Sequence, residues 1–248
     1  LLLKYGTIAA ESALAALLLN PRGKFSGKGQ RNGYRRFRAE INGIDLQCKL
    51  LDQADNPLSD GPNLKPIFCV AEWSAYQSYV AIDLGNHIRS GRISRAIVSE
   101  FLSLCAQVGE GLNAQAVIWT PANLVSGFRY FAESVEQYQT GGPFPILALV
   151  DFQIHKNSGA FEMRSDGQAV VSSGLSWFSD QELAISSDRL TIPELLRRAV
   201  HIARDVASNG AIVRPMQIDG LDENEMLMMQ PSIDLKMLHV TVSSKMGE

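Results

Sequence analysis

The chain has 248 residues, of which 46% are hydrophobic and 20% charged, the balance of an ordinary globular protein. That length suffices for one large domain or two packed halves, and no segment approaches the ~18 apolar residues of a membrane-spanning helix. A formal net charge of −3 argues against bulk attraction to nucleic acid or to an anionic membrane, so neither is an expected partner.

The first segment, residues 1–20, is rich in Leu and Ala but is interrupted by Glu11. A signal peptide has an uninterrupted apolar core followed by a cleavage site of small residues. Here Asn20 and Pro21 follow the leucines instead, so we expect a core-facing helix that ends at Asn20.

Residues 22–38 form the strongest charge feature, with seven basic and no acidic residues, which leaves 16 basic against 26 acidic residues elsewhere. Interleaved glycines and aromatic residues would suit nucleic-acid phosphates, with Arg31, Arg35 and Arg36 as candidate contacts. The alternative is a solvated loop leading into an edge strand, where charge opposes aggregation. We favour the alternative because the balance of −10 in the rest of the chain would repel nucleic acid.

Two dipeptides predict β-hairpins. Asn42-Gly43 separates the strand-like runs 37–41 and 44–50, and Asp166-Gly167 separates 161–165 and 168–173. A two-residue type I′ turn needs positive φ at both positions, which these residues tolerate best.

Each predicted hairpin is followed by a strand, a long helix and another strand. In the first half these are 78–85, 92–110 and 114–119, with glycines 109 and 111 ending the helix. In the second half they are 182–186, 192–208 and 211–218. Thr191 and Glu194 have the spacing of a capping box, and Asn209-Gly210 is a C-cap signal. We expect this helix to bury Leu196, Ala199, Val200, Ala203 and Val206.

Further elements complete the chain. A helix is expected over residues 126–138, followed by a linker at 139–145 whose glycines and prolines break regular structure. Residues 145–154 resemble a strand buried on both faces, 219–225 an exposed acidic loop and 233–242 the last strand. Four of the seven methionines lie in 225–238, where they suit either a partner-binding surface or, as we favour, the core.

These elements predict an α+β fold with two similar halves, each a mainly antiparallel sheet with helices packed on one face. The N-terminal half would span residues 1–140 and the C-terminal half 141–248, packed as one globular unit. Cys48, Cys69 and Cys105 are an odd number at wide spacings, which is neither a disulfide framework nor a zinc pattern. Buried reduced thiols favour a cytoplasmic location.

The sequence contains two segments that resemble catalytic motifs without matching them. Gly23 and Gly27 are spaced wrongly for a phosphate-binding loop, and Phe178 stands where a nucleophile elbow around Ser176 needs glycine. No two histidines have metal-ligand spacing, so we predict neither a metal nor a cofactor. Asp180 and Glu182 would share one face of a strand, and we expect both to be solvent-exposed.

The second half nevertheless resembles a known pattern. Gly174-Leu175, Phe178, Glu182-Leu183, Asn209-Gly210 and Asp219-Gly220 match the C-terminal pattern of the DUF4261 family, although Ser179 and Ala184 depart from it. The resemblance covers about residues 65–243. It implies a bacterial origin and carries over no catalytic residues.

Three functions stay open. The first is a non-catalytic bacterial protein that binds a protein partner, in an accessory or immunity-like role. The second is an enzyme with its site between the halves, using His87, Trp119, Glu182 and Asp219 at strand ends. The third is weak nucleic-acid binding through residues 22–38. We favour the first, because no convergent catalytic motif is present in the sequence.

Overall fold

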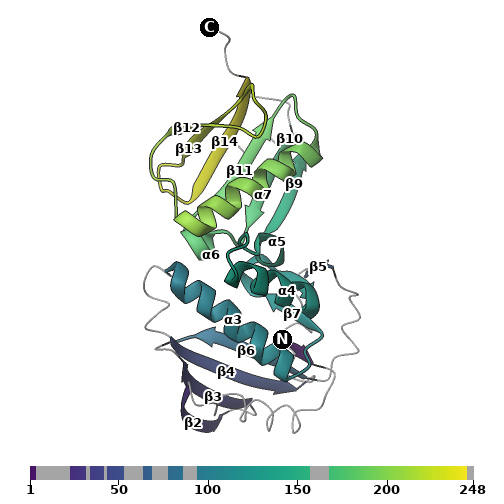
Figure 1. Ribbon diagram of the computed structural model, residues 1–248, viewed down its shortest axis with the longest axis vertical. Coiled ribbons are helices and arrows are strands. Elements are labelled where there is room, and N and C mark those ends of the chain that lie inside the picture. Colours follow the sequence, from purple (N-terminus) through teal and green to yellow (C-terminus); the bar gives the residue numbers. More distant parts are fainter. Residues whose placement is uncertain are drawn as a thin grey trace. The chain divides into compact units, whose positions relative to one another are not determined.

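The computed structural model describes residues 1–3, 23–31, 34–41, 44–52, 64–68, 78–85, 94–156 and 168–244. The chain divides into two compact units (Figure 1). The first unit comprises Leu1–Trp119 with Asn123–Pro143, and the second comprises Thr120–Ala122 with Phe144–Glu248. Each unit combines helices with a mostly antiparallel sheet, so the predicted α+β class is confirmed.

The first unit is built on a sheet with the strand order β2-β3-β4-β6-β1-β7-β8-β5. Neighbouring strands run antiparallel, except that β5 and β8 are parallel. The strands are β1 (Leu2–Leu3), β2 (Gly23–Arg31), β3 (Tyr34–Ile41), β4 (Ile44–Asp52), β5 (Lys65–Ile67), β6 (Ser78–Leu84), β7 (Ala116–Trp119) and β8 (Leu124–Gly127).

The predicted hairpin at Asn42-Gly43 is confirmed by register, because Ile41 pairs with Ile44 and only these two residues lie between them. The expected solvated loop in the basic segment is wrong. Residues 23–31 form the edge strand β2, and Arg31 pairs with Tyr34 across a second two-residue connection. Asn32-Gly33 carries the same hairpin signal as Asn42-Gly43 and accounts for this.

Helices α3 (Arg95–Gly111) and α4 (Phe128–Gln139) confirm the two helices predicted in this half. Ser94 caps α3 by accepting a hydrogen bond from the Ile97 N–H at 3.3 Å. Gly109 does not end the helix. It allows the Phe128 ring to approach, since a Cβ on Gly109 would lie 2.1 Å from Phe128 Cε2.

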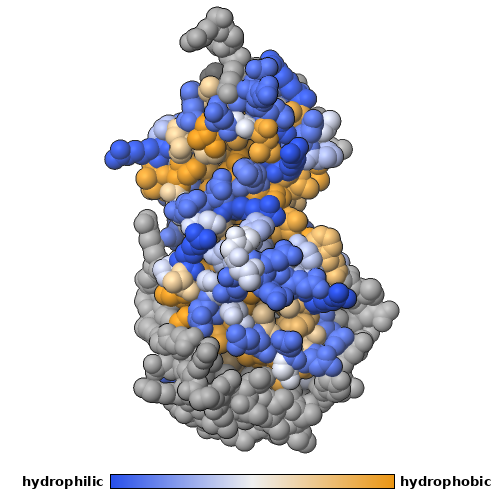
Figure 2. Space-filling model, viewed as in Figure 1, coloured by the Kyte–Doolittle hydropathy of each residue, from blue (hydrophilic) through white to orange (hydrophobic). Residues whose placement is uncertain are grey.

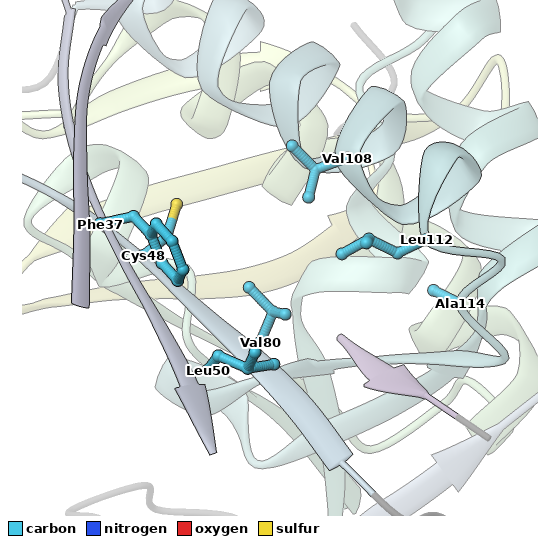
Figure 3. Packing of buried hydrophobic residues seen from close by; sticks show 7 residues of the cluster. All are labelled: Phe37, Cys48, Leu50, Val80, Val108, Leu112 and Ala114. Carbon is cyan, nitrogen blue, oxygen red and sulfur yellow. The ribbon is translucent and has the colours of Figure 1, made fainter. Parts of the chain in front are cut away.

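The core of this unit lies on both faces of its sheet. The cluster in Figure 3 comprises Phe37, Cys48, Leu50, Val80, Val108, Leu112 and Ala114. A second cluster comprises Leu51, Tyr79, Ala116 and Val125. Successive residues of a strand face opposite sides, so the neighbours Leu50 and Leu51 are buried in different clusters.

The second unit has a sheet with the strand order β12-β13-β14-β11-β10-β9, in which only β11 and β14 pair in parallel. Helix α7 packs against β9, β10 and β11 (Figure 1). The strands are β9 (Asp151–Lys156), β10 (Gln168–Ser173), β11 (Glu182–Ser187), β12 (Met216–Asp219), β13 (Glu225–Pro231) and β14 (Met237–Ser244). The helical segments are η3 (Thr120–Ala122), α5 (Ile146–Leu149), α6 (Ser176–Ser179) and α7 (Ile192–Asn209). The two sheets differ in strand order, and the predicted similarity of the halves is not confirmed.

Helix α7 has the predicted capping box. The N–H and hydroxyl of Thr191 both donate to Glu194 Oε2, at 2.8 and 2.7 Å. The helix ends at Asn209 before Gly210, whose φ is +93°. Its buried stripe is displaced from the predicted one: Leu196 and Val200 are half-buried, and the buried residues are Leu195, Arg198, Ala199, Ile202, Ala203 and Val206.

Four strand predictions in this half are wrong in part; one of them is 211–218, because β12 begins only at Met216. Residues 146–149 form a helical turn, and Ile154 of β9, the end strand of the described sheet, is exposed, so 145–154 is not a strand buried on both faces. β10 pairs with β9 on one side and β11 on the other, which excludes the predicted pairing with 161–165. Residues 157–167 themselves lie outside the described residues.

The last strand begins at Met237 instead of Ile233, because side chains bond locally to the backbone before it. Asp234 Oδ1 accepts from the Ser232 hydroxyl at 2.7 Å and from the Lys236 N–H at 3.0 Å. Such local bonds favour a turn over a strand. None of the helices in the described part of the chain has the length and apolarity needed to cross a membrane.

Candidate functional site

Of the four residues predicted for an enzyme site, Glu182 and Asp219 are the two that the described structure places within one unit. Trp119 is a core residue of the first unit, with its ring 6.5 Å from that of Phe101. His87 lies outside the described residues. Glu182 and Asp219 both belong to the second unit, so the strand register sets their separation.

Glu182 pairs with Met237 on β14, whereas Asp219 pairs with Met226, which in turn pairs with Ser243 of β14. These two positions, Met237 and Ser243, are six residue steps apart along β14. At about 3.3 Å per residue the displacement along the strand alone is about 20 Å. The two carboxylates therefore cannot act on one substrate atom.

Glu182 is a structural anchor and not the exposed residue that we expected. Its carboxylate accepts four hydrogen bonds from the end of β10 and the turn that follows it. The donors are the Ser172 hydroxyl at 2.5 Å and the backbone N–H groups of Gly174, Leu175 and Ser176 at 2.8, 3.2 and 3.0 Å. With every donor satisfied by one carboxylate, this turn is fixed against β11. Asp180, the other half of the predicted pair, is exposed.

Gly174 is needed in this turn for two reasons. Its φ of +94° is in the region that disfavours side chains. A Cβ would also lie 2.7 Å from the Cβ of Ala122. The Gly174-Leu175 and Glu182-Leu183 positions, which carry the family resemblance, thus belong to one hydrogen-bonded structural unit.

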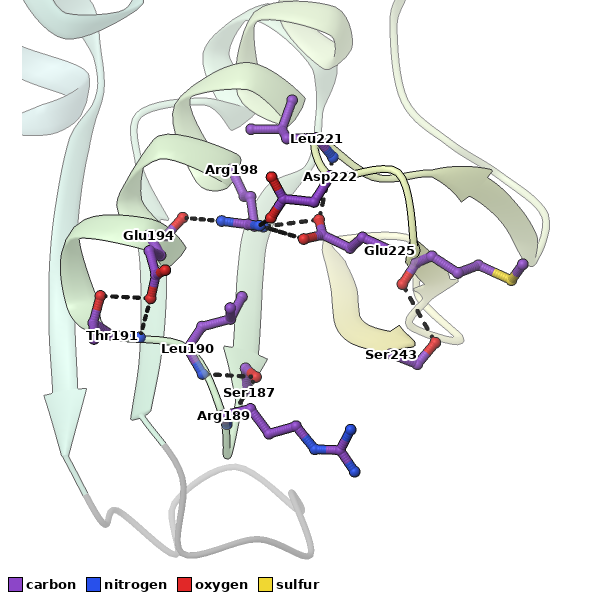
Figure 4. A network of polar contacts seen from close by, with 11 residues as sticks. Ser187, Arg189, Leu190, Thr191, Glu194, Arg198, Leu221, Asp222, Glu225 and Ser243 are labelled. Atoms are coloured by element: carbon purple, nitrogen blue, oxygen red, sulfur yellow. Dashed lines mark hydrogen bonds and ion pairs between the residues drawn. The ribbon is translucent and has the colours of Figure 1, made fainter. Parts of the chain in front are cut away.

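A buried ion cluster forms between Arg198 on α7 and two residues of the predicted acidic loop, Asp222 and Glu225 (Figure 4). Glu225 is buried, and both of its oxygens accept from Arg198 Nε, at 2.8 and 2.9 Å. Arg198 also donates to the side chain of exposed Asp222 and to the backbone carbonyl of Glu194 at 3.1 Å. The expectation that residues 219–225 form a wholly exposed loop is wrong for Glu225.

The ion cluster shifts both of its buried groups toward their charged forms. The hydrogen bond from Arg198 holds the pKa of Glu225 below its usual value of 4.5, and the bond to Glu225 raises the pKa of Arg198. Gly220 packs closely against this pair: a Cβ at this position would lie 2.3 Å from Glu225 Oε1, so a larger residue would collide with the carboxylate. The cluster ties α7 to the turn between β12 and β13.

The basic segment lies on β2 and β3. Arg31 is the last residue of β2, and Arg35 and Arg36 occupy successive positions of β3, opposite Leu50 and Lys49 of β4. Successive positions of a strand belong to opposite faces of a sheet, so Arg35 and Arg36 occupy positions on opposite faces. Arg38 forms a bidentate ion pair with Asp45, with both N–O distances 2.8 Å.

A group of large apolar side chains is exposed at one corner of the second sheet. We define the β12 corner as Val213, Met216, Ile233 and Leu235, which lie just before β12, at its first residue and in the turn between β13 and β14. Figure 2 shows apolar surface over β12 and β13 among polar residues. Met228, opposite Gln217, is also exposed, whereas Met229 is buried. The methionines of 225–238 are thus divided between surface and core.

The buried amide of Gln181 fixes the two segments of the β12 corner to each other. Its Nε2 donates to the carbonyls of Ile212 and Leu235, both at 3.3 Å, and its Oε1 accepts from the Ile212 N–H at 3.2 Å. Sequence reasoning missed this corner because Val213 and Ile233 were assigned to strands. Gln181 carries no signal that distinguishes it from a surface glutamine.

Within the described residues, no three His, Cys, Asp or Glu side chains gather closely enough to hold a metal ion. Comparison of the chain with protein-family models, with curated proteins and with solved structures found no match. The resemblance to the DUF4261 family and the bacterial origin that it implies therefore stay predictions.

Proposed function

We propose that this protein acts without catalysis, by binding a protein partner through the β12 corner. The observation that carries the proposal is the exposure of Val213, Met216, Ile233 and Leu235 at one place on the second unit. Grouped apolar side chains at a surface are typical of interaction sites. An accessory or immunity-like role is the class of function that such a dedicated surface suits.

The hydrogen bonds that hold the segments of the β12 corner in place support the proposal. Gln181 joins its two segments, and Ser232 and Asp234 fix the turn that carries Ile233 and Leu235. A surface held in one conformation loses little conformational entropy on binding. The apolar side chains are therefore presented in a fixed arrangement before any partner arrives.

The chemistry of the buried charged groups in the second unit also favours binding over catalysis. The carboxylate of Glu182 is engaged by four donors within its own turn. Arg198 and Glu225 satisfy each other. Both groups hold the fold in place, and their charges are engaged within the unit itself. A cytoplasmic location is part of the proposal and is supported by the free, buried Cys48 and Cys105.

The proposal is tested by binding measurements on matched surface variants. Val213 and Ile154 are both 51% exposed and both belong to the second unit, but only Val213 lies in the corner. A partner isolated with the tagged chain is purified, and its affinity is measured for the wild type, for Val213→Ser with Leu235→Ser, and for Ile154→Ser.

We expect the corner variant to bind about tenfold or more weakly, as for loss of two contacts at the centre of an interface, and Ile154→Ser to bind as the wild type. Equal affinity of the corner variant and the wild type would contradict the proposal. So would an equal loss of affinity in Ile154→Ser.

A further inference from the structure

We propose that the partner at the β12 corner is a second copy of this chain, paired antiparallel along β12 about a two-fold axis at Gln217. The inference rests on the proposed function and names the occupant of the same surface. β12 is the end strand of its sheet among the described residues. An end strand has one side on which a further strand can pair.

The hydrogen-bond parity of β12 determines which backbone groups face that side. The Gly220 N–H donates to the Glu225 carbonyl at 2.9 Å, and the register pairs Ile218 with Leu227. In an antiparallel ladder the bonded pairs recur every second residue. Gly220 and Ile218 therefore bond toward β13, and the N–H and C=O of Gln217 point away from it.

A two-fold axis at Gln217 lets the two copies exchange both of these bonds, N–H to C=O in each direction. In this register Met216 of each copy lies opposite Ile218 of the other. Met216 is exposed and Ile218 half-buried, and both share a face with buried Met229 and Leu227. Pairing thus extends an apolar row from one sheet into the next.

The opposite face of the edge is compatible with the same pairing. Exposed Met228 lies opposite Gln217 on β13, so the methionines of both copies flank the two glutamine side chains at the axis. The amides of the two glutamines can donate to and accept from each other.

Charge favours an antiparallel second copy over other extended partners. Arg214 is exposed just before β12, and Asp219, Asp222 and Glu223 are exposed at and after its end. Antiparallel pairing sets the basic start of each strand beside the acidic end of the other. Pro215 has no N–H to donate, so the paired segment is short and centres on Gln217. One segment thereby supplies both halves of a self-complementary interface.

The test is the mass of the full chain in solution, measured by sedimentation from the lowest detectable concentration to the solubility limit. We expect a dimer that dissociates on dilution. Gln217→Pro removes the outward N–H without breaking a bond to β13 and should weaken dimerisation about thirtyfold or more. Gln217→Ala, which keeps the N–H, should retain most of the affinity. Thermal unfolding of both variants checks that they fold.

A charge-reversal series tests the register independently. Arg214→Asp and Asp219→Arg should each weaken dimerisation about threefold, and the double variant should regain wild-type affinity. A monomer at every concentration overturns the inference, as does a dimer that Gln217→Pro leaves unchanged. A monomer that still binds a different protein through Val213 and Leu235 overturns this inference alone and leaves the proposed function standing.

Discussion

In the first unit the described interior consists mainly of apolar side chains on both faces of one sheet, whereas the second unit buries several polar and charged groups. Phe37, Leu50 and Leu51 typify the first interior. Gln181, Arg198 and Glu225 are buried in the second, where each joins segments distant in sequence. Apolar contact holds layers together without fixing loops closely, but directional bonds place a loop in one position. The second unit is therefore the one that presents a fixed surface.

The largest expected effect comes from breaking the buried ion pair. Arg198→Met leaves the Glu225 carboxylate buried without its main partner, which should cost about 3–5 kcal/mol. Hydrogen exchange measures this separately for α7 and α3, and only the α7 amides should lose protection. The double variant Arg198→Met with Glu225→Leu should recover much of the loss. Equal loss of protection in α3 would contradict the contrast between the units.

Acid should act on the same pair. Because the pKa of Glu225 is lowered by Arg198, the stability that the pair provides is present above about pH 4.5 and is lost as the pH falls through the lower folded-state value. Protection of the α7 amides should fall over that range in the wild type. It should fall less in the double variant, where the carboxylate is absent.

The second effect is that of the Glu182 anchor. Glu182→Ala strips one acceptor from the Ser172 hydroxyl and three backbone N–H groups, and unsatisfied buried donors should cost about 2–3 kcal/mol. Asp180→Asn, an exposed change two residues away, should cost little. Urea unfolding of the two variants side by side measures the difference, and equal midpoints would remove the structural role assigned to Glu182.

The third effect is a loss of stability at alkaline pH that is expected in the first unit, where two cysteine thiols are buried. Burial raises the pKa of Cys48 and of Cys105 to about 12 from an ordinary value of 9.0. The folded state keeps these protons when the unfolded chain loses them, so stability should fall as the pH rises above about 9 and should continue to fall toward 12. The slope is at most about 1.4 kcal/mol per pH unit for each thiol.

Measurement of α3 protection between pH 9 and pH 11 tests this effect, with the Cys48→Ala and Cys105→Ala variants as controls. Each variant should flatten the slope, whatever its absolute stability. An unchanged slope in both would show that other groups titrate there.

Local signals in the sequence predicted much of the fold. The turn dipeptide Asn42-Gly43 and the capping box Thr191/Glu194 each depend on residues close in sequence, and both are confirmed. The helix predicted over 92–110 is confirmed as α3, whose periodic apolar residues from Phe101 onward are buried. The errors concern distant partners. Asp166-Gly167 follows a segment whose place beside β10 is taken by β9, which no local pattern records.

The candidate site was harder to predict for the same reason. Arg198 is buried on α7 only because Glu225 lies 27 residues away in sequence and directly beside it in space. Glu182 was expected in solvent because its donors sit in another element. The exposure of Val213 and Ile233 depends on Gln181 and on the turn at Asp234, which end the strands that hydrophobicity alone would extend.

The most direct test of the account is the exchange rate of the Gln217 amide, resolved by NMR in dilute and in bound protein. The Gln217 N–H faces the free side of β12, so it should exchange rapidly in the isolated chain and become protected in the complex. The Ile218 N–H, which bonds toward β13, should be protected in both. A Gln217 amide that exchanges equally fast in isolated and bound protein would contradict binding at this edge.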